Sequence, residues 1–455
     1  LWIEDVELYG ARSIRPHSED ATAIEQIHAQ GCEVLRFLSQ HTAFSTKAIG
    51  LCFPRGSNTL DCMPVFLDHA ATSPCRAASL EALQGALAQL GNPSSVHGHG
   101  QNTRAILEDA RDQVAASLGA NRSEIVFTSG GTEANNQAIK GIFWARRQED
   151  PRRKVIVTAA TEHHALLDPI DWLVEHEGAE VVNVAVSQNG MVDLDDLNEV
   201  LQVRQAEIAF VSLMWVNNET GVITDIPKVC EMATNLGIPV HSDAIAAVGH
   251  VEVDFSASGL TAMSISGHKF GAPIGVGALV VARDFSPVSL LHGGGQERGL
   301  RSGTMNYPLA AALGAACQEA VTDRAERQKR LGKLRNRIED EVVGAIPNAI
   351  VTAKDAIRVD HNAHIIFPGT QSDNLLFLLD QEGVSVSAGS ACQAGVLGAS
   401  HVLVAMGYSE ELASACLRIT LGHTTTEQDV ERFIEAIIKI HPGALVASQS
   451  SQSAN

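Results

Sequence analysis

Short apolar runs alternate with helix-like segments through the middle of the chain, and this alternation constrains the fold more than any other feature. From Glu124 onward, most of these runs are apolar at consecutive positions, as in strands that helices cover on both faces. The helix patterns between them include "GTEANNQAIKGIFWARRQ" and "DIPKVCEMATNLG". Together they predict a mainly parallel, doubly wound α/β sheet. The strand candidates are "EIVFT", "KVIVTAA", "EVVNVAV", "IAFVSLMWV", "IPVHSDA", "AMSIS" and "VGALVVA".

The pattern changes after about Pro308, where a smaller α+β unit is expected. One long amphipathic helix, "EAVTDRAERQKRLGKLRNRIEDEVVGAI", precedes "HIIFPG", the helix pattern "SDNLLFLLDQEG" and the strand pattern "LRITLG". A last helix is expected to start at a capping box from Thr424 to Glu427, and the polar end "VASQSSQSAN" is expected to fray. The predicted organisation is an N-terminal extension (1–62), a large domain whose first segment also contributes to the small one (63–307), a small domain (308–441) and a disordered tail (442–455).

Composition and charge exclude several classes of protein. With 45% apolar and 19% charged residues, the chain has the composition of a globular protein rather than a disordered one. No uninterrupted apolar run of membrane-spanning length occurs, so no membrane partner is expected. A formal net charge of −20 argues against direct nucleic-acid binding through phosphates. The acidic segment before residue 63 resembles neither a transit peptide nor a signal peptide, so an appended extension is expected there.

The cysteines are scattered along the chain. There are eight of them, with no Cys-x-x-Cys pair and no spacing typical of metal ligands. This usage predicts a reduced, cytoplasmic compartment, thiols that are mostly buried, no disulfide framework and no metal site.

Three stretches place polar side chains where strands are expected to end. "FTSGGTEANN" passes from a strand through glycines into a helix, which indicates either an anion-binding turn or an ordinary strand-to-helix turn. In "HSDAIAAVGH", Asp243 ends a strand where open α/β sheets bind ligands, although a helix N-cap is the alternative. In "SISGHKFG", Lys269 follows a strand, where a partly desolvated lysine either pairs with a hidden acid or forms a Schiff base with a carbonyl.

In their order along the chain, these stretches resemble the motifs of the cysteine desulfurases, pyridoxal phosphate (PLP) enzymes of the class V aminotransferase group. The resemblance covers about 65–441. It implies the PLP-dependent transferase fold type I (aspartate-aminotransferase-like), an α/β fold with a mainly parallel seven-stranded sheet in a large domain and a smaller α+β domain. It also implies conversion of L-cysteine to L-alanine. The motifs are "FLDHAATSP", "GNPSSVHGHG", "FTSGGTEANN", "TEHHALLDP", "VNNETGVI", "HSDA", "SGHK", "GGGQERGLRSGT", "SAGSACQAGVLGASHVL" and "LRITLG".

The resemblance implies a role for each residue that matches a family motif. Lys269 would carry the cofactor as a Schiff base, and Asp243 would hold the ring nitrogen. Arg418 would bind the substrate carboxylate with help from Asn92. His163 would stack on the ring and transfer protons, whereas a satisfied core histidine is the alternative. The other cofactor contacts would be Gly131, Thr132, Asn218, Ser266, His268 and, from a partner subunit, Thr304.

Cys392 is implied as the nucleophile that receives the sulfur as a persulfide. It lies in "VSVSAGSACQAGVLGAS", whose small residues predict a mobile, exposed loop, and the remaining cysteines are expected to be structural. This long loop resembles the first desulfurase group, which serves iron–sulfur cluster assembly and thiolation. The expected partners are therefore L-cysteine, a second copy in a homodimer, and a sulfur acceptor such as an iron–sulfur scaffold or a thiolation protein.

Some positions depart from the family pattern. Ala246 stands where glutamine is usual, Ala272 and Ile274 where glycine and lysine are usual, and His423 where arginine is common. Without the amide at 246, the ring oxygen of the cofactor loses a donor, and a hydrogen bond to a charged group is worth about 1.5–3 kcal/mol. Two alternatives stay open: another PLP-dependent lyase or aminotransferase, such as selenocysteine lyase, or a catalytically weak PLP-binding scaffold.

Overall fold

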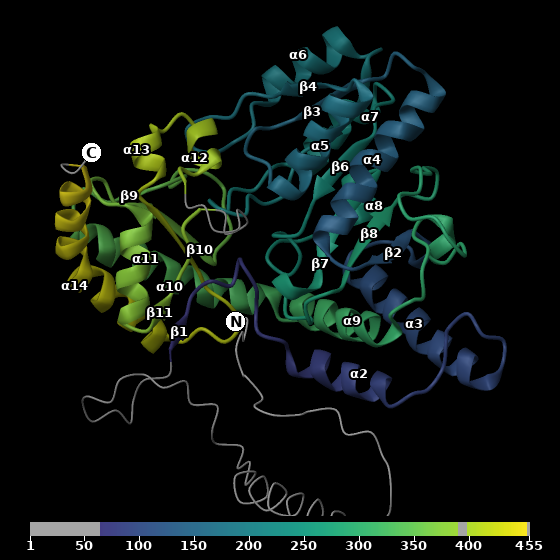
Figure 1. The fold of residues 1–455 in the computed structure, drawn as a ribbon, viewed down its shortest axis with the longest axis horizontal. Helices are drawn as coiled ribbons and strands as arrows, with labels where there is room; N and C mark the ends of the chain where they lie inside the picture. The colour runs from purple at the N-terminus through teal and green to yellow at the C-terminus, as the bar shows by residue number, and fades with distance from the viewer. Residues whose placement is uncertain (1–63, 390–397, 453–455) are drawn as a thin grey trace, which may run out of the picture. The chain divides into compact units, whose positions relative to one another are not determined.

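The computed structural model describes residues 64–389 and 398–452 (Figure 1). The predicted N-terminal extension, the nucleophile candidate Cys392 and the last three residues lie outside this described part. Within it, no helix is both long enough and apolar enough to cross a lipid bilayer.

A seven-stranded sheet forms the centre of the larger part of the fold, with the strand order β2-β8-β7-β6-β5-β3-β4. Strand β8 runs antiparallel to both of its neighbours, and the other pairs are parallel. Each strand falls within one of the apolar runs of the sequence, so the predicted mainly parallel sheet is confirmed. The bounds are β2 (Ile125–Thr128), β3 (Val155–Thr158), β4 (Glu180–Asn183), β5 (Ile208–Ser212), β6 (Val240–Asp243), β7 (Ala262–Ser266) and β8 (Gly277–Val281).

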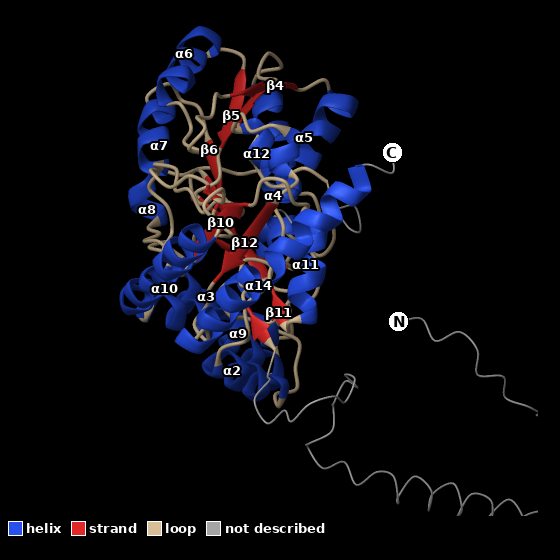
Figure 2. Ribbon diagram, turned by 90° about the vertical axis from the view of Figure 1, so that its left-hand side faces the viewer, coloured by secondary structure: helices blue, strands red, loops and turns tan. Residues whose placement is uncertain are grey.

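Helices cover both faces of this sheet (Figure 2). Successive side chains of a strand point to opposite faces, so Phe210 of β5 packs with one helix layer and Val211 with the other. This two-sided burial explains why the strands read as continuous apolar runs. The first layer contains α4 (Gly131–Glu149) and α5 (His164–Glu177), and the second contains α3 (Gly98–Ser117), α6 (Leu194–Arg204), α7 (Ile226–Thr234) and α9 (Tyr307–Thr322).

A separate antiparallel sheet, ordered β12-β10-β9, lies in the C-terminal part and has its own apolar core. Parallel pairing of β1 (Val65–Phe66) with β11 (Val384–Ser385) ties the first described residues to this part. The remaining strands and helices around it are β9 (Ile350–Val351), β10 (Asn362–Ile366), β12 (Cys416–Thr420), α10 (Arg324–Ala345), α11 (Ser372–Gln381) and α14 (Glu427–Gln452). Shorter helices are α2 (Ala77–Leu87), α8 (Phe255–Ser258), α12 (His401–Ala405) and α13 (Glu410–Ala413).

The predicted long helix after Pro308 is wrong as a single element, because α9 ends at Thr322 and α10 begins at Arg324. The break falls at Asp323, whose carboxylate pairs with Arg76 at 3.1 Å and with Arg327. The pair with Arg76 joins residues 247 positions apart, so it is not readable from helix periodicity.

Both ends of α14 also differ from the prediction. The reciprocal cap joins Thr426 to Asp429, because the Thr426 amide donates to the Asp429 carboxylate and the Asp429 amide donates to the Thr426 hydroxyl. The box is therefore two residues later than Thr424–Glu427. At the other end, the helix continues through 442–452, where a disordered tail was predicted. Its residue Ala444 is fully buried in the same apolar core as Phe433, which stabilises the helix beyond Pro442.

Buried histidines make the fold sensitive to acid. Burial lowers the pKa of His241, His361 and His364 to about 3 each. In the unfolded chain these side chains bind protons below about pH 6.5, while the folded chain does not, so acidification favours unfolding.

We expect the unfolding temperature to fall between pH 7 and pH 5, since each such histidine costs up to about 2 kcal/mol at pH 5. Thermal unfolding by circular dichroism measures this. A His364→Asn variant should lose less stability over this range, and equal unfolding temperatures at both pH values would contradict the expectation.

Candidate active site

A cavity of about 330 Å³ lies where β6 and β7 end. Side chains from both sheets line it, because Arg418 comes from β12 while Asp243 and Ser266 end β6 and β7. Ends of adjacent parallel strands meet at one edge of a sheet, which is where open α/β folds bind ligands. The predicted site residues that line this cavity are Gly131, Thr132, His163, Asn218, Asp243, Ser266, His268, Lys269 and Arg418.

The Asp243 carboxylate is the buried acid of this cavity. Its side chain accepts hydrogen bonds from the Asn135 amide at 2.7 Å and from the Ile245 backbone N–H at 2.9 Å. Burial raises the pKa of Asp243, while the two donors and the charge of Lys269 oppose that rise. A carboxylate in this position is placed to stabilise a positive charge on a ligand.

Lys269 supplies the amine. It ends the 3₁₀ turn Gly267–Lys269 directly after β7, and its Nζ donates to the backbone carbonyls of Ala70 at 2.5 Å and Ala71 at 3.1 Å. These carbonyls follow β1, so a segment from the start of the described chain orients the amine. The amine therefore lies on the cavity wall in a fixed, partly buried place, as a lysine that reacts with a carbonyl requires.

The start of α4 forms an anion cradle beside the amine. A Cβ atom at Gly131 would lie 2.2 Å from Ile245 Cδ1, so a larger residue here would require the Ile245 side chain to move. No side chain caps the helix start, which leaves its backbone N–H groups for a ligand. Burial and the charge of Lys269 lower the pKa of His268 to about 4, and its buried Nδ1 has no hydrogen-bond partner among the described residues. These groups suit a phosphate.

His163 is a neutral imidazole at the first turn of α5. Its Nδ1 accepts a hydrogen bond from the Ala165 backbone N–H at 2.9 Å, which places the ring proton on Nε2. Burial, followed by the positive charge of Lys269, lowers its pKa to about 4. Around neutral pH the ring is therefore able to accept or relay a proton.

Arg418 is held in place by two groups at the end of the cavity. One guanidinium nitrogen donates to Asp68 Oδ1 at 3.0 Å and the other to the Asn218 carbonyl at 3.0 Å. Only 2% of Arg418 is exposed, and its Nε has no hydrogen-bond partner within the described part of the chain. A fixed, buried guanidinium with an unused donor suits a ligand carboxylate.

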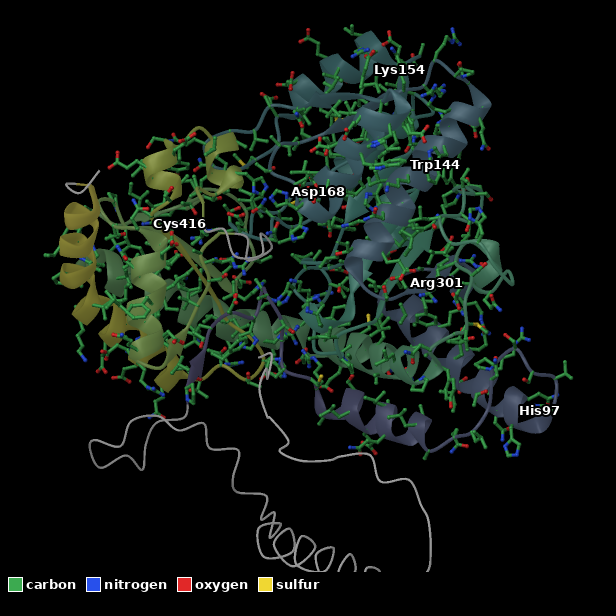
Figure 3. The ribbon with its side chains drawn as sticks, in the orientation of Figure 1. His97, Trp144, Lys154, Asp168, Arg301 and Cys416 are labelled. Carbon is green, nitrogen blue, oxygen red and sulfur yellow. The ribbon has the colours of Figure 1, made fainter. Side chains whose placement is uncertain are left out.

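The described cysteines are not suited to nucleophilic chemistry. Cys230, Cys317 and Cys416 are buried, and burial raises the pKa of each to about 12 (Cys416 is labelled in Figure 3). Cys75 is half-buried rather than buried, and burial raises its pKa as well. Since the thiolate is the nucleophile, the three buried thiols are inert near neutral pH.

Glu219 lies beside the chain on both sides of the segment that contains Cys392. Its carboxylate accepts a hydrogen bond from the Ser400 hydroxyl at 2.5 Å and lies 3.3 Å from the Cβ position of Gly389. Ser387, two residues before Gly389, pairs with Arg418 through backbone hydrogen bonds of 2.7 and 3.2 Å. The described chain before that segment therefore lies beside Arg418.

Two predicted site residues do not line the cavity. Asn92 lies in an exposed turn, where its side chain accepts from the Ser94 backbone N–H at 2.9 Å. Thr304, expected to act in a partner subunit, is exposed. Of the departures from the family pattern, Ala246 lines the cavity, Ile274 is exposed, and His423 lies 6.5 Å from the ring of His69.

Sequence reasoning missed several residues of this site. The cavity also contains His69 and the stacked rings of His250 and His361, whose centroids are 3.7 Å apart. Asn135 and Asp68 orient Asp243 and Arg418. Asn135 lies within the motif "FTSGGTEANN" and Asp68 within "FLDHAATSP", and these motifs were the signal by which the two residues could have been found.

Comparisons with known proteins agree with this geometry. The family Aminotransferase class-V matches residues 65–433, a range that contains every residue lining the cavity. The IscS-like cysteine desulfurase of Mycobacterium tuberculosis is 47% identical over 392 residues, covering 85% of this chain and 100% of that protein. A NifS-like protein from Rickettsia africae has a similar structure, with a TM-score of 0.75, 30% identity and coverage of 84% and 100%. SspA in complex with cysteine is similar at a TM-score of 0.68 and 30% identity, with coverage of 79% and 99%.

The contact between Asn135 and Asp243 is testable. We expect Asn135→Ala to weaken PLP binding about tenfold, because one hydrogen bond to a carboxylate is worth about 1.5 kcal/mol. Fluorescence titration of the apoprotein with PLP measures the affinity. Asn136→Ala is the matched control on the same helix, since its side chain donates to the Thr132 carbonyl one turn earlier and not to Asp243. Equal affinities of the two variants would contradict a role for Asn135.

Proposed function

Because this chain belongs to the class-V aminotransferase family and, within it, to the PLP-dependent cysteine desulfurases with fold type I, we propose that its cavity holds PLP and L-cysteine. Lys269 and Asp243 carry the cofactor, Arg418 carries the substrate carboxylate, and Cys392 receives the sulfur. The observation that supports this proposal most strongly is the buried acid Asp243 in one cavity with the amine of Lys269.

The residues of the cavity fit PLP. The close approach at Gly131, the uncapped start of α4 and the unpaired Nδ1 of His268 suit its phosphate, with Thr132 and Ser266 as further donors. When bound, PLP supplies an electron sink that lets the Cα–H bond of an amino acid break. Asp243 would stabilise the positive ring nitrogen, and the buried Oδ1 of Asn218, which has no partner among the described residues, suits a polar group of the ligand.

Proton transfer falls to two side chains. Lys269 is placed to take the Cα proton of the substrate at Nζ and to return a proton later. The neutral ring of His163 holds its proton on Nε2, and its low pKa keeps it able to accept a second proton only transiently. Lys269 would therefore transfer the Cα proton, and His163 would transfer protons transiently beside it.

Arg418 orients the substrate. Its guanidinium already binds Asp68 and the Asn218 carbonyl, so the side chain is fixed before cysteine arrives. Its Nε, which has no partner among the described residues, could donate a hydrogen bond to the carboxylate of the substrate. Binding the carboxylate here would fix the position of the substrate sulfur relative to the protein.

In this proposal, the substrate sulfur is transferred to Cys392. The Cys392 thiolate attacks the substrate Sγ, the Cβ–S bond of cysteine breaks, and the electrons of that bond remain with the carbon fragment. This fragment takes up protons and leaves as L-alanine. The balance is cysteine plus one protein thiol giving alanine plus one protein persulfide, with no external oxidant or reductant. The described cysteines do not compete, because burial keeps their thiols protonated.

Further partners follow from the same proposal. The exposed Thr304 would complete the phosphate site of a second copy of the chain in a homodimer. The persulfide would pass to a sulfur-acceptor protein, either an iron–sulfur scaffold or a thiolation protein. A free reactive thiol is compatible with the reduced, cytoplasmic setting that the cysteine usage predicts.

The first experiment compares the PLP-loaded protein with its Cys392→Ser variant in the presence of L-cysteine and a thiol reductant. We expect the variant to lose alanine formation at least about 100-fold, because the nucleophile is removed, while the absorbance of bound PLP stays unchanged. Alanine is quantified by chromatography and the persulfide by mass spectrometry. Cys75→Ser is the control, since that thiol is the half-buried one among the described cysteines. Alanine formation by Cys392→Ser at the parental rate would reject the assignment.

A second prediction concerns Arg418. Lysine keeps the positive charge but lacks the planar fork of donors, so we expect Arg418→Lys to raise the KM for L-cysteine about 10- to 100-fold. The affinity for PLP should change little, because Arg418 is assigned to the substrate. Steady-state kinetics and PLP titration separate the two effects. A normal KM with weakened PLP binding would contradict this role.

A further inference from the structure

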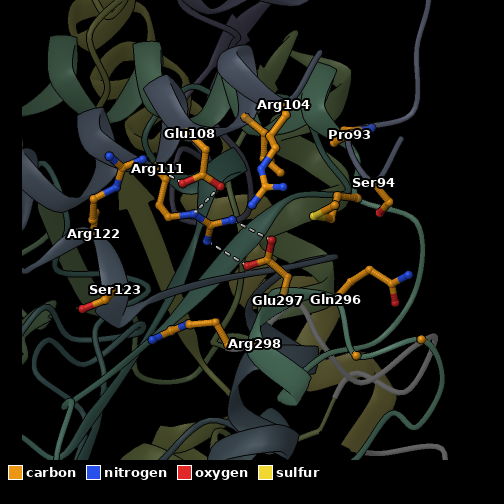
Figure 4. Close-up of a pocket in the computed structure, with 14 residues that line it drawn as sticks. Pro93, Ser94, Arg104, Glu108, Arg111, Arg122, Ser123, Gln296, Glu297 and Arg298 are labelled. Carbon is orange, nitrogen blue, oxygen red and sulfur yellow. Dashed lines mark hydrogen bonds and ion pairs between the residues drawn. The ribbon is translucent and has the colours of Figure 1, made fainter. Parts of the chain in front are cut away.

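A second cavity, of about 620 Å³, lies between the segment 293–298 and α3 (Figure 4). Its wall carries the guanidinium groups of Arg104, Arg111, Arg122 and Arg298. Figure 4 shows Arg111 of α3 at its centre, paired with Glu297 and also with Glu108. The segment belongs to the motif "GGGQERGLRSGT", which ends at the exposed Thr304.

The backbone at Glu297 and Arg298 adopts an unfavourable conformation. Their φ angles are +44° and +60°, in the left-handed region that residues other than glycine rarely occupy. Two such residues in succession persist only where the surrounding structure holds them. The contacts of their side chains must therefore account for this turn.

The contacts of Glu297 hold the turn against the edge strand β2. The carboxylate accepts two hydrogen bonds from Arg111, at 2.8 and 2.7 Å, and a third from the Phe127 backbone N–H at 3.0 Å. Arg111 also donates to the Ile125 carbonyl at 2.8 Å, so both partners are tied to β2. The side chain of Glu297 is 2% exposed and that of Arg111 is 10% exposed, so this is a buried ion pair.

A second ion pair holds the segment a few residues later. Arg301, labelled in Figure 3, donates from Nε to Glu133 Oε1 at 2.8 Å. Glu133 also accepts from the Ser129 backbone N–H at 2.8 Å and lies in the first turn of α4, next to Thr132. The segment is thus fixed on β2 at Glu297 and on the phosphate-binding turn at Arg301, and Thr304 follows directly.

We propose that Arg111 and Glu297 are positioning residues for cofactor binding, because their ion pair holds the left-handed turn that presents Thr304 to the phosphate of a second subunit. This inference rests on the proposed function, in which Thr304 acts across a homodimer. Neither residue contacts the cofactor itself. Their effect on PLP affinity is transmitted through the 297–304 segment.

The test compares Glu297→Gln with a matched control, Glu339→Gln. Glu339 of α10 also forms a buried, two-bond ion pair, with hydrogen bonds of 2.5 and 2.8 Å to Arg358 and side-chain exposures of 7% for both residues. Apoprotein is titrated with PLP, and thermal unfolding is recorded for each variant. We expect Glu297→Gln to weaken PLP binding about 10- to 100-fold, because small displacements of a positioned group have effects of this size. Glu339→Gln should lower the unfolding temperature without changing PLP affinity.

A second variant covers the case in which Glu297→Gln does not fold. In Glu297→Gly, position 297 adopts positive φ without strain, but the carboxylate that anchors the turn to Arg111 and to the Phe127 backbone N–H is absent. We expect this variant to fold and to show the same weakening of PLP binding. Wild-type affinity in Glu297→Gly would overturn the proposal, because the ion pair would then be unnecessary for placing Thr304.

Thr304→Val separates failure of this inference from failure of the proposed function. Weaker PLP binding in both Thr304→Val and Glu297→Gln supports the inference. Weakening in Thr304→Val with a wild-type affinity in Glu297→Gln overturns the positioning role and leaves the proposed function intact. A wild-type affinity in Thr304→Val removes the role of Thr304 and, with it, this inference.

Mixed dimers test whether Glu297 of one subunit affects PLP binding in the other subunit. One chain carries Lys269→Ala, so only the other chain binds PLP through a lysine. Glu297→Gln on the Lys269→Ala chain should weaken the single remaining site, whereas Glu297→Gln on the same chain as Lys269 should not. The absorbance of lysine-bound PLP reports the occupancy. The opposite pattern would overturn the proposal.

Discussion

The buried carboxylate of Asp243 is the interaction on which the rest of the site depends. An unpaired charge is costly inside a protein, so a carboxylate that is 4% exposed needs donors from several elements. Asn135 supplies one from α4, and the Ile245 backbone N–H supplies another from the turn after β6. The packing of α4 against the sheet and the geometry of the acid therefore support each other. A ligand with a positive ring nitrogen would complete this arrangement.

The parallel sheet explains why residues distant in sequence meet in one cavity. Strands β6 and β7 are adjacent and parallel, so Asp243 and Lys269 reach the same edge. The second sheet contributes Arg418 from β12, and the pairing of β1 with β11 brings the carbonyls of Ala70 and Ala71 to the amine. In the proposed function, the large sheet would thus hold the cofactor, and the C-terminal sheet would supply the group that binds the substrate carboxylate.

Sequence periodicity predicted the seven strands well, because two-sided burial leaves a continuous apolar signal. The lysine and the aspartate were predictable for a related reason, since each directly follows such a run. The break at Asp323 and the helix beyond Pro442 were not, because they depend on contacts with residues distant in sequence. The cap at Thr426 is a local Thr-x-x-Asp pattern, and the preceding Thr424 and Thr425 made its exact start ambiguous. The same limit applies within the site: Asn135 donates across 108 positions of sequence, and no local pattern encodes that pairing.

Burial also separates reactive groups from inert ones in this fold. It raises the pKa of the thiols of Cys230, Cys317 and Cys416 to about 12, so these side chains fill the core without reacting. It lowers the pKa of His163 to about 4, so the imidazole remains a neutral base beside the amine. Burial therefore keeps these thiols protonated and unreactive, and it keeps the histidine in its neutral form. The thiol proposed to accept the sulfur needs a place outside the apolar core and near Arg418, the residue proposed to bind the substrate carboxylate. The two described ends of the Cys392 segment meet at Glu219, and Ser387 ties the first of them to Arg418.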